Sequence, residues 1–176
     1  MSLIRLATSD DAADIAQLMI GFRDWWEKTD PADECFHAGI PRLLADPNTD
    51  FLLGGDPPAG VCQLRYRFSL WTGGDCWLED IFVEEHARGS GMGRELMEAA
   101  LARARERGCV RMELDVNEKN PAAVALYESL GFESWSDPPG GRKDWHGQEH
   151  SVVQTSGHHK VAALGPHLSA KSGPPR

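Results

Sequence analysis

The sequence predicts an α/β domain in which a mixed, mostly antiparallel central sheet is flanked by helices and followed by an irregular C-terminal tail. Over residues 1–136, segments with apolar residues at helical spacing alternate with shorter segments that suit strands. Residues 137–176 instead hold five of the seven histidines and only scattered apolar side chains. With 176 residues, of which 41% are hydrophobic, the chain suits a single domain that buries its own core.

The N-terminal third is expected to contribute one strand and two helices. Residues 2–6 form a short alternating run of apolar and polar side chains, as in a strand. Residues 8–11 then offer N-cap side chains to a helix that passes through residues 15–22. A second helix is expected from residue 31 or 33 to residue 44, because the Asp-Pro pair that follows disfavours helical backbone.

Three antiparallel strands are expected in the middle of the chain. Residues 51–53 and 60–70 are apolar-rich runs joined by the Gly- and Pro-rich turn at residues 54–58. A second turn, at residues 72–75, leads into residues 76–83, where Trp, Ile, Phe and Val suit a central strand. The three runs together predict a meander.

A long helix, a strand and a short helix are expected next. Residues 91–107 place apolar side chains at helical spacing, with glutamates early and arginines late, which complements the helix dipole. Residues 110–116 alternate as a strand does. Asn120 is the expected N-cap of a helix that starts at Pro121 and stops at Gly131.

The charge of the chain limits its partners. The net charge is −9, with −11 in residues 1–136 and +2 in residues 137–176. Nucleic acid is therefore not an expected partner, because such binding depends on Lys and Arg, whereas an acidic surface favours cations. The sequence shows neither a long apolar run nor a signal peptide, so we expect no membrane contact and a cytoplasmic location. The four widely spaced cysteines suit reduced thiols.

The most informative motif is the glycine-rich run Arg-Gly-Ser-Gly-Met-Gly-Arg at residues 88–94. It lies between an expected strand and the start of the long helix, where backbone N–H groups and the helix dipole favour a phosphate. The dinucleotide fingerprint fails because Arg94 replaces its last glycine, and the Walker loop lacks its Gly-Lys pair. The nucleophile elbow fails because Arg88 replaces its first glycine. The motif therefore indicates a pyrophosphate site.

This run resembles the acyl-CoA-binding motif of the GNAT family of N-acetyltransferases, Q/R-x-x-G-x-G/A, which is met by Arg88, Gly91 and Gly93. The order of the other elements, Asn120 and Tyr127 agrees with that family over roughly residues 3 to 135. The resemblance implies a GNAT domain over residues 1–136, acetyl-CoA as co-substrate, and a homodimer as one assembly. Residues 137–176 would form a polar, His-, Pro- and Gly-rich tail.

The resemblance also assigns residues to the cofactor. The main chain of three residues in the central strand would pair with the pantetheine arm, and the glycine-rich run would hold the pyrophosphate. Two residues of the last helix would flank the other side of the cofactor. The implied cofactor-binding residues are Ile81, Phe82, Val83, Arg88, Gly89, Ser90, Gly91, Met92, Gly93, Arg94, Asn120 and Ala123.

Two further side chains are candidates for catalysis. Tyr127 occupies the position of the family's usual general acid, which would protonate the departing CoA thiolate; the alternative is a half-buried aromatic that only packs. An ammonium acceptor must lose a proton before it attacks, and Glu79 is the first candidate base, with Asp80 second. A structural role for Glu79, in an ion pair or a solvated face, is equally compatible with the sequence.

The expected reaction is acetyl transfer from acetyl-CoA to a primary amine, by direct attack in a ternary complex. The run Leu-Glu-Asp-Ile-Phe-Val at residues 78–83 is similar to the diamine acetyltransferase branch, so a small cationic amine is the expected partner. Trp25 and Trp26 lie where the family often borders the acceptor pocket, although packing explains them equally well. The alternatives are an acyl-CoA-binding module without turnover, and acetylation of a protein or peptide amino group.

The tail departs from the family, which adds two more strands after the position of Phe132. Only residues 151–155 and 161–164 suit such strands here, and a missing wall of the acceptor site would favour the module without turnover. The letters H-x-x-E-H at residues 146–150 match a zinc protease motif, but the glycine inside them opposes the helix that this motif needs. No metal is therefore expected.

Overall fold

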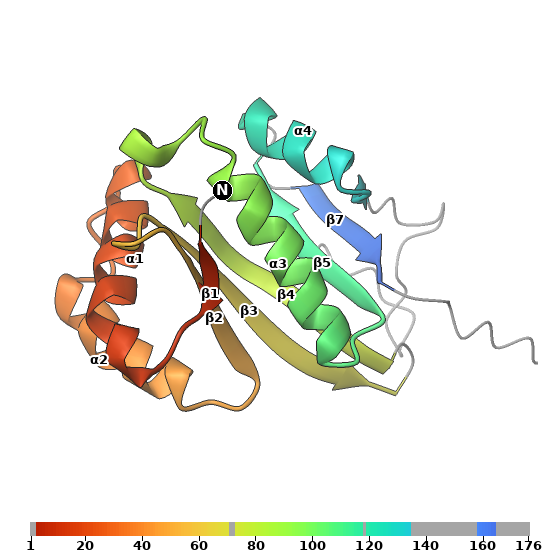
Figure 1. Cartoon of the computed structure of the whole chain (residues 1–176), viewed down its shortest axis with the longest axis horizontal. Coiled ribbons are helices and arrows are strands. Elements are labelled where there is room, and N and C mark those ends of the chain that lie inside the picture. Colours follow the sequence, from red (N-terminus) through yellow and green to blue (C-terminus); the bar gives the residue numbers. More distant parts are fainter. Residues whose placement is uncertain (1–2, 71–72, 118, 135–157, 165–176) are drawn as a thin grey trace, which may run out of the picture.

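The computed structural model describes residues 3–70, 73–117, 119–134 and 158–164. They form one seven-stranded sheet with helices against both faces (Figure 1). The strands are β1 (Ile4–Leu6), β2 (Thr49–Gly54), β3 (Gly60–Ser69), β4 (Gly73–Val83), β5 (Arg111–Val116), β6 (Glu133–Ser134) and β7 (His158–Ala163). The helices are α1 (Ala12–Trp25), α2 (Asp33–Leu44), α3 (Met92–Glu106) and α4 (Pro121–Ser129), with single 3-10 turns η1 (Ser9–Asp11) and η2 (Glu85–Ala87).

The sheet is mixed and mostly antiparallel, as predicted. The strand order is β1-β2-β3-β4-β5-β7-β6. Every neighbouring pair is antiparallel except β4 and β5, which run parallel and are connected through α3. A helical crossover is the usual connection for a parallel pair, whereas the antiparallel pairs can use short turns. The helices and strands predicted upstream of Gly131 are all present, with ends that shift by a few residues.

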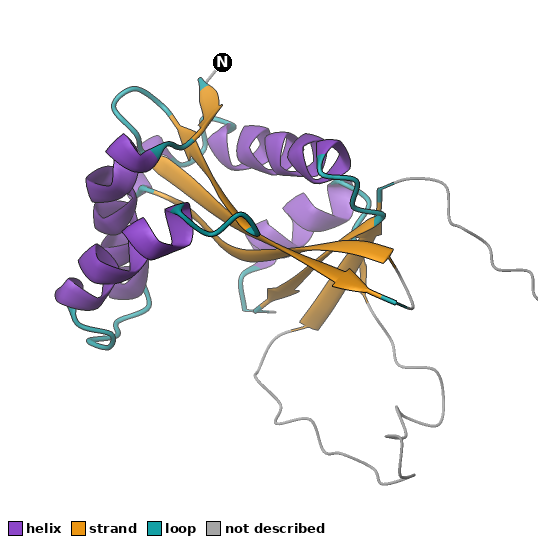
Figure 2. Ribbon diagram, turned by 90° about the horizontal axis from the view of Figure 1, so that it is seen from below, coloured by secondary structure: helices purple, strands orange, loops and turns teal. Residues whose placement is uncertain are grey.

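Two hydrophobic cores lie on opposite faces of the sheet. Helices α3 and α4 cover one face, and α1 and α2 cover the other (Figures 1 and 2). The α3 stripe predicted from the sequence is buried, with Leu96 and Met97 fully enclosed. On the other face, Ile15 of α1 packs with Phe51 of β2 and Phe82 of β4. Strand β4 therefore contributes to both cores.

The first turn of the N-terminal helical region is held by a buried carboxylate. Asp11 accepts hydrogen bonds from both terminal nitrogens of Arg5, at 2.8 and 2.6 Å, and from the backbone N–H of Thr8 at 2.7 Å. These donors, Arg5 foremost, hold the pKa of Asp11 well below its usual range. Thr8 and Asp11 thus form a capping box at the 3-10 turn η1, with Arg5 of β1 as an additional partner, whereas Asp11 makes no side-chain capping hydrogen bond as the N-cap of α1.

An irregularity in the β3–β4 hairpin changes which way β4 faces. Gln63 pairs with Asp80 and Leu64 pairs with Leu78, so Glu79 is one extra residue on β4. Such a bulge shifts the two-residue alternation of the strand by one position. Leu78 accordingly packs on the α3 side, whereas Phe82, four residues on, packs on the α1 side. The sequence analysis did not predict this bulge.

The C-terminal part of the chain supplies a strand to the sheet. β7 pairs with β5 along six residues, from Arg111–Ala163 to Val116–His158, and β6 pairs with β7. The candidate strand at residues 161–164 therefore overlaps an actual strand, whereas the candidate at 151–155 lies outside the described residues. Lys160 is almost fully buried and its Nζ donates to Glu128 of α4 at 3.0 Å. The domain boundary at residue 136 itself stays a prediction.

None of the helices in these four ranges is both long enough and apolar enough to cross a membrane.

Candidate active site

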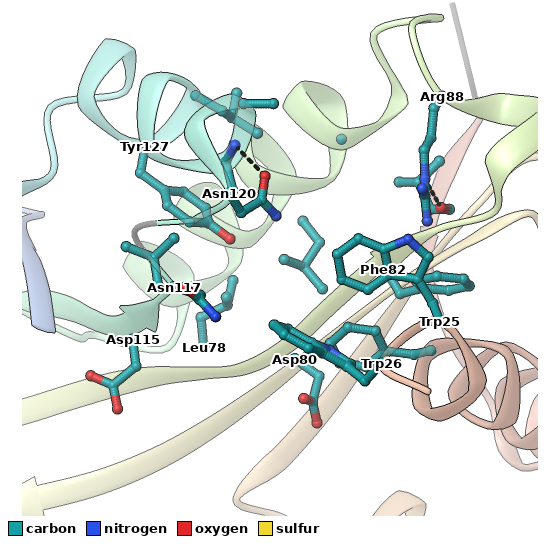
Figure 3. Close-up of a pocket in the computed structure, with 18 of the residues that line it drawn as sticks. Trp25, Trp26, Leu78, Asp80, Phe82, Arg88, Asp115, Asn117, Asn120 and Tyr127 are labelled. Carbon is teal, nitrogen blue, oxygen red and sulfur yellow. Dashed lines mark hydrogen bonds between the residues drawn. The ribbon is translucent and has the colours of Figure 1, made fainter. Parts of the chain in front are cut away.

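A cleft opens where the parallel strands separate. The β4–β5 ladder runs from the Asp75–Arg111 pair to the Leu78–Leu114 pair, while β4 continues to Val83 and β5 to Val116. A cavity of about 420 Å³ lies here, between these strand ends, α4, the loop before α3 and the end of α1 (Figure 3). The main chain of β4 beyond Leu78 therefore lines a cavity on the side where β5 would otherwise continue the ladder.

The glycine-rich run has the geometry of an anion site. Gly89 and Gly91 have φ angles of 75° and 95°, which L side chains rarely adopt, and a Cβ on either would meet no atom within 4 Å. Gly91 is the N-cap of α3, so the N–H groups of Gly93 and Arg94 in the first turn lack acceptors within the helix. Open space beside exposed N–H groups at a helix N-terminus suits a phosphate.

The polar side chains of this run are engaged with protein groups. The hydroxyl of Ser90 donates to the carbonyl of Ala87 at 2.7 Å, which shapes the loop. Arg94 donates to Ser129 of α4 at 2.7 Å. Arg88 donates through Nε to the carbonyl of Val83 at 2.9 Å and lies along the wall of the cavity.

Helix α4 forms the opposite wall. Asn120 caps it, since its Oδ1 accepts from the N–H of Ala123 at 3.2 Å, and Figure 3 shows the other end of this amide turned toward the cavity. The Tyr127 side chain is 5% exposed, and its hydroxyl points into the cavity (Figure 3). Burial, and secondarily the nearby Cys62, raises the pKa of Tyr127 above its ordinary value. The phenol therefore keeps its proton at neutral pH.

The two carboxylates at the bulge have different surroundings. Glu79 is exposed, whereas Asp80 is half-buried, and both line the cavity. Burial, with a smaller contribution from the charge of Glu79, raises the pKa of Asp80 to about 6. A carboxyl group with a pKa near 6 is ionised at neutral pH and still accepts a proton more readily than an ordinary aspartate. Asp80 thus has the environment that a general base requires.

Aromatic side chains from the end of α1 close the cleft. Trp25 and Trp26 are 45% and 40% exposed, and their rings meet edge to face with centroids 5.1 Å apart. Phe22 contacts both, and Figure 3 shows Trp26 beside Asp80 and Trp25 beside Arg88. The sequence left open whether these tryptophans pack or border a pocket, and the structure places them in the cavity wall.

Most of the predicted site residues meet in this cavity. Those that line it are Glu79, Ile81, Phe82, Val83, Arg88, Gly89, Gly93, Asn120, Ala123 and Tyr127. Ser90, Gly91 and Arg94 lie in the adjoining loop and first turn, and Met92 points into the α3 core, where it is 6% exposed. Sequence analysis missed Asn117 and Leu126, which also line the cavity. The position of Asn117, one residue past a strand at the parallel pair, was the available indication.

Within the described ranges, no group of three or more His, Cys, Asp or Glu side chains is arranged to hold a metal ion. The H-x-x-E-H run at residues 146–150 lies outside them. The four cysteines are unpaired; Cys62, Cys76 and Cys109 are buried, and Cys35 is exposed.

The fold and the cleft together define an α/β protein with a candidate anion-binding cleft, and comparison with known proteins identifies its family. The model of the acetyltransferase (GNAT) family matches residues 13–132. The chain therefore belongs to the GNAT family.

Individual relatives agree with this assignment. The chain is 31% identical over 116 residues to the thialysine N-epsilon-acetyltransferase of Sus scrofa, covering 63% of this chain and 61% of that protein. It is 31% identical over 137 residues to an aminoglycoside N(6')-acetyltransferase type 1 of Stenotrophomonas maltophilia, covering 74% of this chain and 85% of that one. A crystal structure from Arthrobacter sp. FB24 superposes with a TM-score of 0.72 at 27% identity, covering 88% of this chain and 96% of that chain.

Proposed function

We propose that the protein is an acetyl-CoA-dependent N-acetyltransferase that acetylates a primary amine by direct attack in a ternary complex. The observation that carries this proposal is the cleft at the β4–β5 separation, whose lining includes the glycine-rich loop, the Asp80 carboxyl and the Tyr127 hydroxyl. The chain matches only about three fifths of the porcine relative, so activity and substrate are inferred from the site rather than transferred from that protein.

The cleft suits acetyl-CoA along its length. The open space at Gly89 and Gly91, with the first N–H groups of α3, fits the diphosphate. The main chain of Ile81, Phe82 and Val83 would pair with the amides of the pantetheine arm, as an added strand does. Bound there, acetyl-CoA supplies an activated acetyl group with a thiolate of pKa near 8.5 as its leaving group.

Asp80 is our candidate for the group that accepts the proton of the amine. An alkylammonium, whose ordinary pKa is about 10.4, has no lone pair, so it must lose one proton before it attacks, and its nitrogen loses a second proton as the N–C bond forms. The Asp80 side chain lines the cavity, as the Trp26 side chain does (Figure 3). Glu79, the first candidate from the sequence, is more exposed and contributes by its charge to the raised pKa of Asp80.

Tyr127 is our candidate for the donor to the leaving sulfur. As the C–S bond breaks, the electron pair stays on sulfur, and the phenolic O–H of Tyr127 donates to it. Its raised pKa keeps the proton on oxygen over the working pH range, so the hydroxyl acts first as a hydrogen-bond donor to the thiolate. Of the two protons that the ammonium nitrogen loses, one goes to the solvent before attack, and Asp80 would accept the other, which balances the proton that the CoA sulfur takes up to become a thiol.

The acceptor is expected to be a small amine that carries positive charge. Residues 1–136 carry −11, and Glu79, Asp80 and Asp115 all line the cavity. An acidic site of this kind raises the local concentration of cations. The names of the porcine and Stenotrophomonas relatives refer to amine-bearing substrates, thialysine and aminoglycosides, and this supports the same chemical class here.

The test is release of CoA thiol from acetyl-CoA in the presence of polyamines, amino acids, aminoglycosides and peptides. We expect turnover with one class of amine and a loss of roughly 10²-fold in kcat for Tyr127→Phe. Tyr66→Phe is the matched control, because Tyr66 is the other tyrosine and its hydroxyl bonds Asp50 at 2.9 Å, away from the cleft. CoA binding without turnover on any amine would instead establish the binding module, and turnover on peptides alone would establish protein acetylation.

A further inference from the structure

The guanidinium of Arg88 lies between two neighbouring cavities. The cavity of the candidate active site has a neighbour, an open hollow that is lined by Gly21, Glu84, Glu85 and His86 together with three residues of the cavity wall. These three shared residues are Trp25, Phe82 and Arg88. The partition between the hollows is thus one guanidinium and two aromatic rings.

The guanidinium is held there by the rings. The Cζ of Arg88 lies 5.2 Å from the Trp25 ring centroid and 5.7 Å from that of Phe82, both within the range of a cation–π contact. Phe82 is almost fully buried in the α1 core, so its ring is a fixed support. Trp25 is about half-exposed at the end of α1 and forms the outer side of the stack (Figure 3).

The same arginine covers a backbone group that the cofactor needs. Its Nε donates to the carbonyl of Val83 at 2.9 Å, and Val83 is one of the residues proposed to pair with the pantetheine arm. Arg88 is also the first residue of the motif proposed to hold the diphosphate. In this structure, therefore, the side chain suited to the diphosphate is bonded at the edge of β4.

We propose that Trp25 is a positioning residue that holds Arg88 in a closed position, and that the diphosphate of the cofactor draws Arg88 away from it. This inference depends on the proposed function, since it needs a diphosphate at the glycine loop. Release of Arg88 frees the Val83 carbonyl for the pantetheine arm and separates the guanidinium from the Trp25 ring. Cofactor binding is thereby coupled to Trp25, which lies in the cavity wall and contacts Trp26.

The contact between Arg88 and Trp25 competes with cofactor binding, so its loss is expected to increase the affinity for CoA. Loss of an exposed cation–π contact corresponds to a factor of roughly two to five in an equilibrium constant. Trp25→Leu, which removes the contact, is expected to bind CoA about two- to fivefold more tightly. Trp25→Phe keeps an aromatic face and is expected to bind CoA as the wild type does.

The experiment measures CoA binding by calorimetry and by tryptophan fluorescence on the full chain. A guanidinium that leaves an indole ring changes its emission, so CoA is expected to alter the fluorescence of the wild type and of Trp26→Phe. The signal is expected to disappear in Trp25→Phe, although calorimetry still records binding. Trp26→Phe is the matched control, because Trp26 touches Trp25 but has no such contact with Arg88.

Two different failures are distinguishable. If CoA does not bind the wild type by calorimetry, the proposed function fails and this inference fails with it. If CoA binds but Trp25→Leu binds equally well or more weakly, or the fluorescence change persists in Trp25→Phe, the role of Trp25 is wrong while the proposed function stands.

Discussion

Gly91→Ala is expected to destabilise the fold and Gly93→Ala to stabilise it, although the two glycines are only two residues apart. Gly91 has a φ of 95°, and an L residue in left-handed backbone costs about 1–2 kcal/mol. At Gly93, inside α3, a Cβ would lie 3.9 Å from Leu126 and 4.0 Å from Val83, which are ordinary contacts. Alanine is favoured over glycine in a helix by about 0.5–1 kcal/mol.

The stability difference is measurable by thermal unfolding. For a chain of this size, 1 kcal/mol shifts Tm by about 2–4 °C. Gly91→Ala is therefore expected to lower Tm by about 2–8 °C, and Gly93→Ala to raise it by about 1–4 °C. Gly91→Asn is a useful third variant, because asparagine tolerates left-handed backbone better than alanine does, and its Tm should lie between those of Gly91→Ala and the wild type.

The CoA affinity of the same variants distinguishes an effect on the binding site from an effect on the stability of the fold. A strained residue 91 moves the N–H groups that open α3, so Gly91→Ala is expected to weaken CoA binding at least about tenfold, since each charge-assisted hydrogen bond contributes roughly 1.5–3 kcal/mol. Gly93→Ala leaves the backbone in place and is expected to stay within about threefold of the wild type. Wild-type stability and affinity in Gly91→Ala would refute both the strained conformation and the anion site.

Three other predictions follow from groups in unusual surroundings. The acid limb of the kcat/KM pH profile is expected near the Asp80 pKa of about 6 and is expected to vanish in Asp80→Asn. In Glu79→Gln the limb is expected to move to lower pH, because the charge of Glu79 raises the pKa of Asp80. A limb that stays in place in both variants would exclude Asp80 as the base. Because the pKa of Asp11 is lowered in the folded state, its carboxylate stabilises the fold above pH about 3.9, and this contribution disappears as the pH falls further. Asp11→Ala is therefore expected to lower the free energy of unfolding in urea by about 2 kcal/mol at pH 7. The difference from the wild type should shrink in acid. Lys160→Met is expected to change stability by less than about 1 kcal/mol or to increase it, because an apolar side chain of similar size avoids the cost of burying the ammonium; a loss above about 3 kcal/mol would contradict this.

The elements that were predicted correctly carry their pattern locally. Helix α3 has an apolar stripe over four turns, and the glycines before it can take the left-handed backbone that Gly89 and Gly91 adopt. Asn120 followed by Pro121 is a helix start on propensity alone, and the structure has that cap. Such signals need no knowledge of the rest of the chain, which explains why the glycine-rich loop and the two helix starts beside it were predictable.

The features that were missed depend on partners distant in sequence. Strand β7 was hard to predict because Lys160 occupies a buried position, and a buried lysine makes sense only when Glu128 of α4 lies opposite it. The ranking of Glu79 above Asp80 as the base could not be checked from sequence, since the two residues are adjacent. Their burial differs because of the register of β3 against β4, which only the structure gives.

The bulge at Glu79 connects the two sides of the proposed reaction. Without an extra residue, Leu78 and Phe82 would face the same side of the sheet, because four residues preserve the alternation of a strand. The bulge instead leaves Ile81 and Val83 against the α3 core and turns Asp80 and Phe82 toward α1. The backbone of β4 beyond Leu78 thereby lines the cavity opposite α4, and Asp80 lines the same cavity as Trp25 and Trp26. In the proposed reaction, one inserted residue would thus allow a cofactor along the strand edge and an amine from the α1 side to meet at the same point of the sheet.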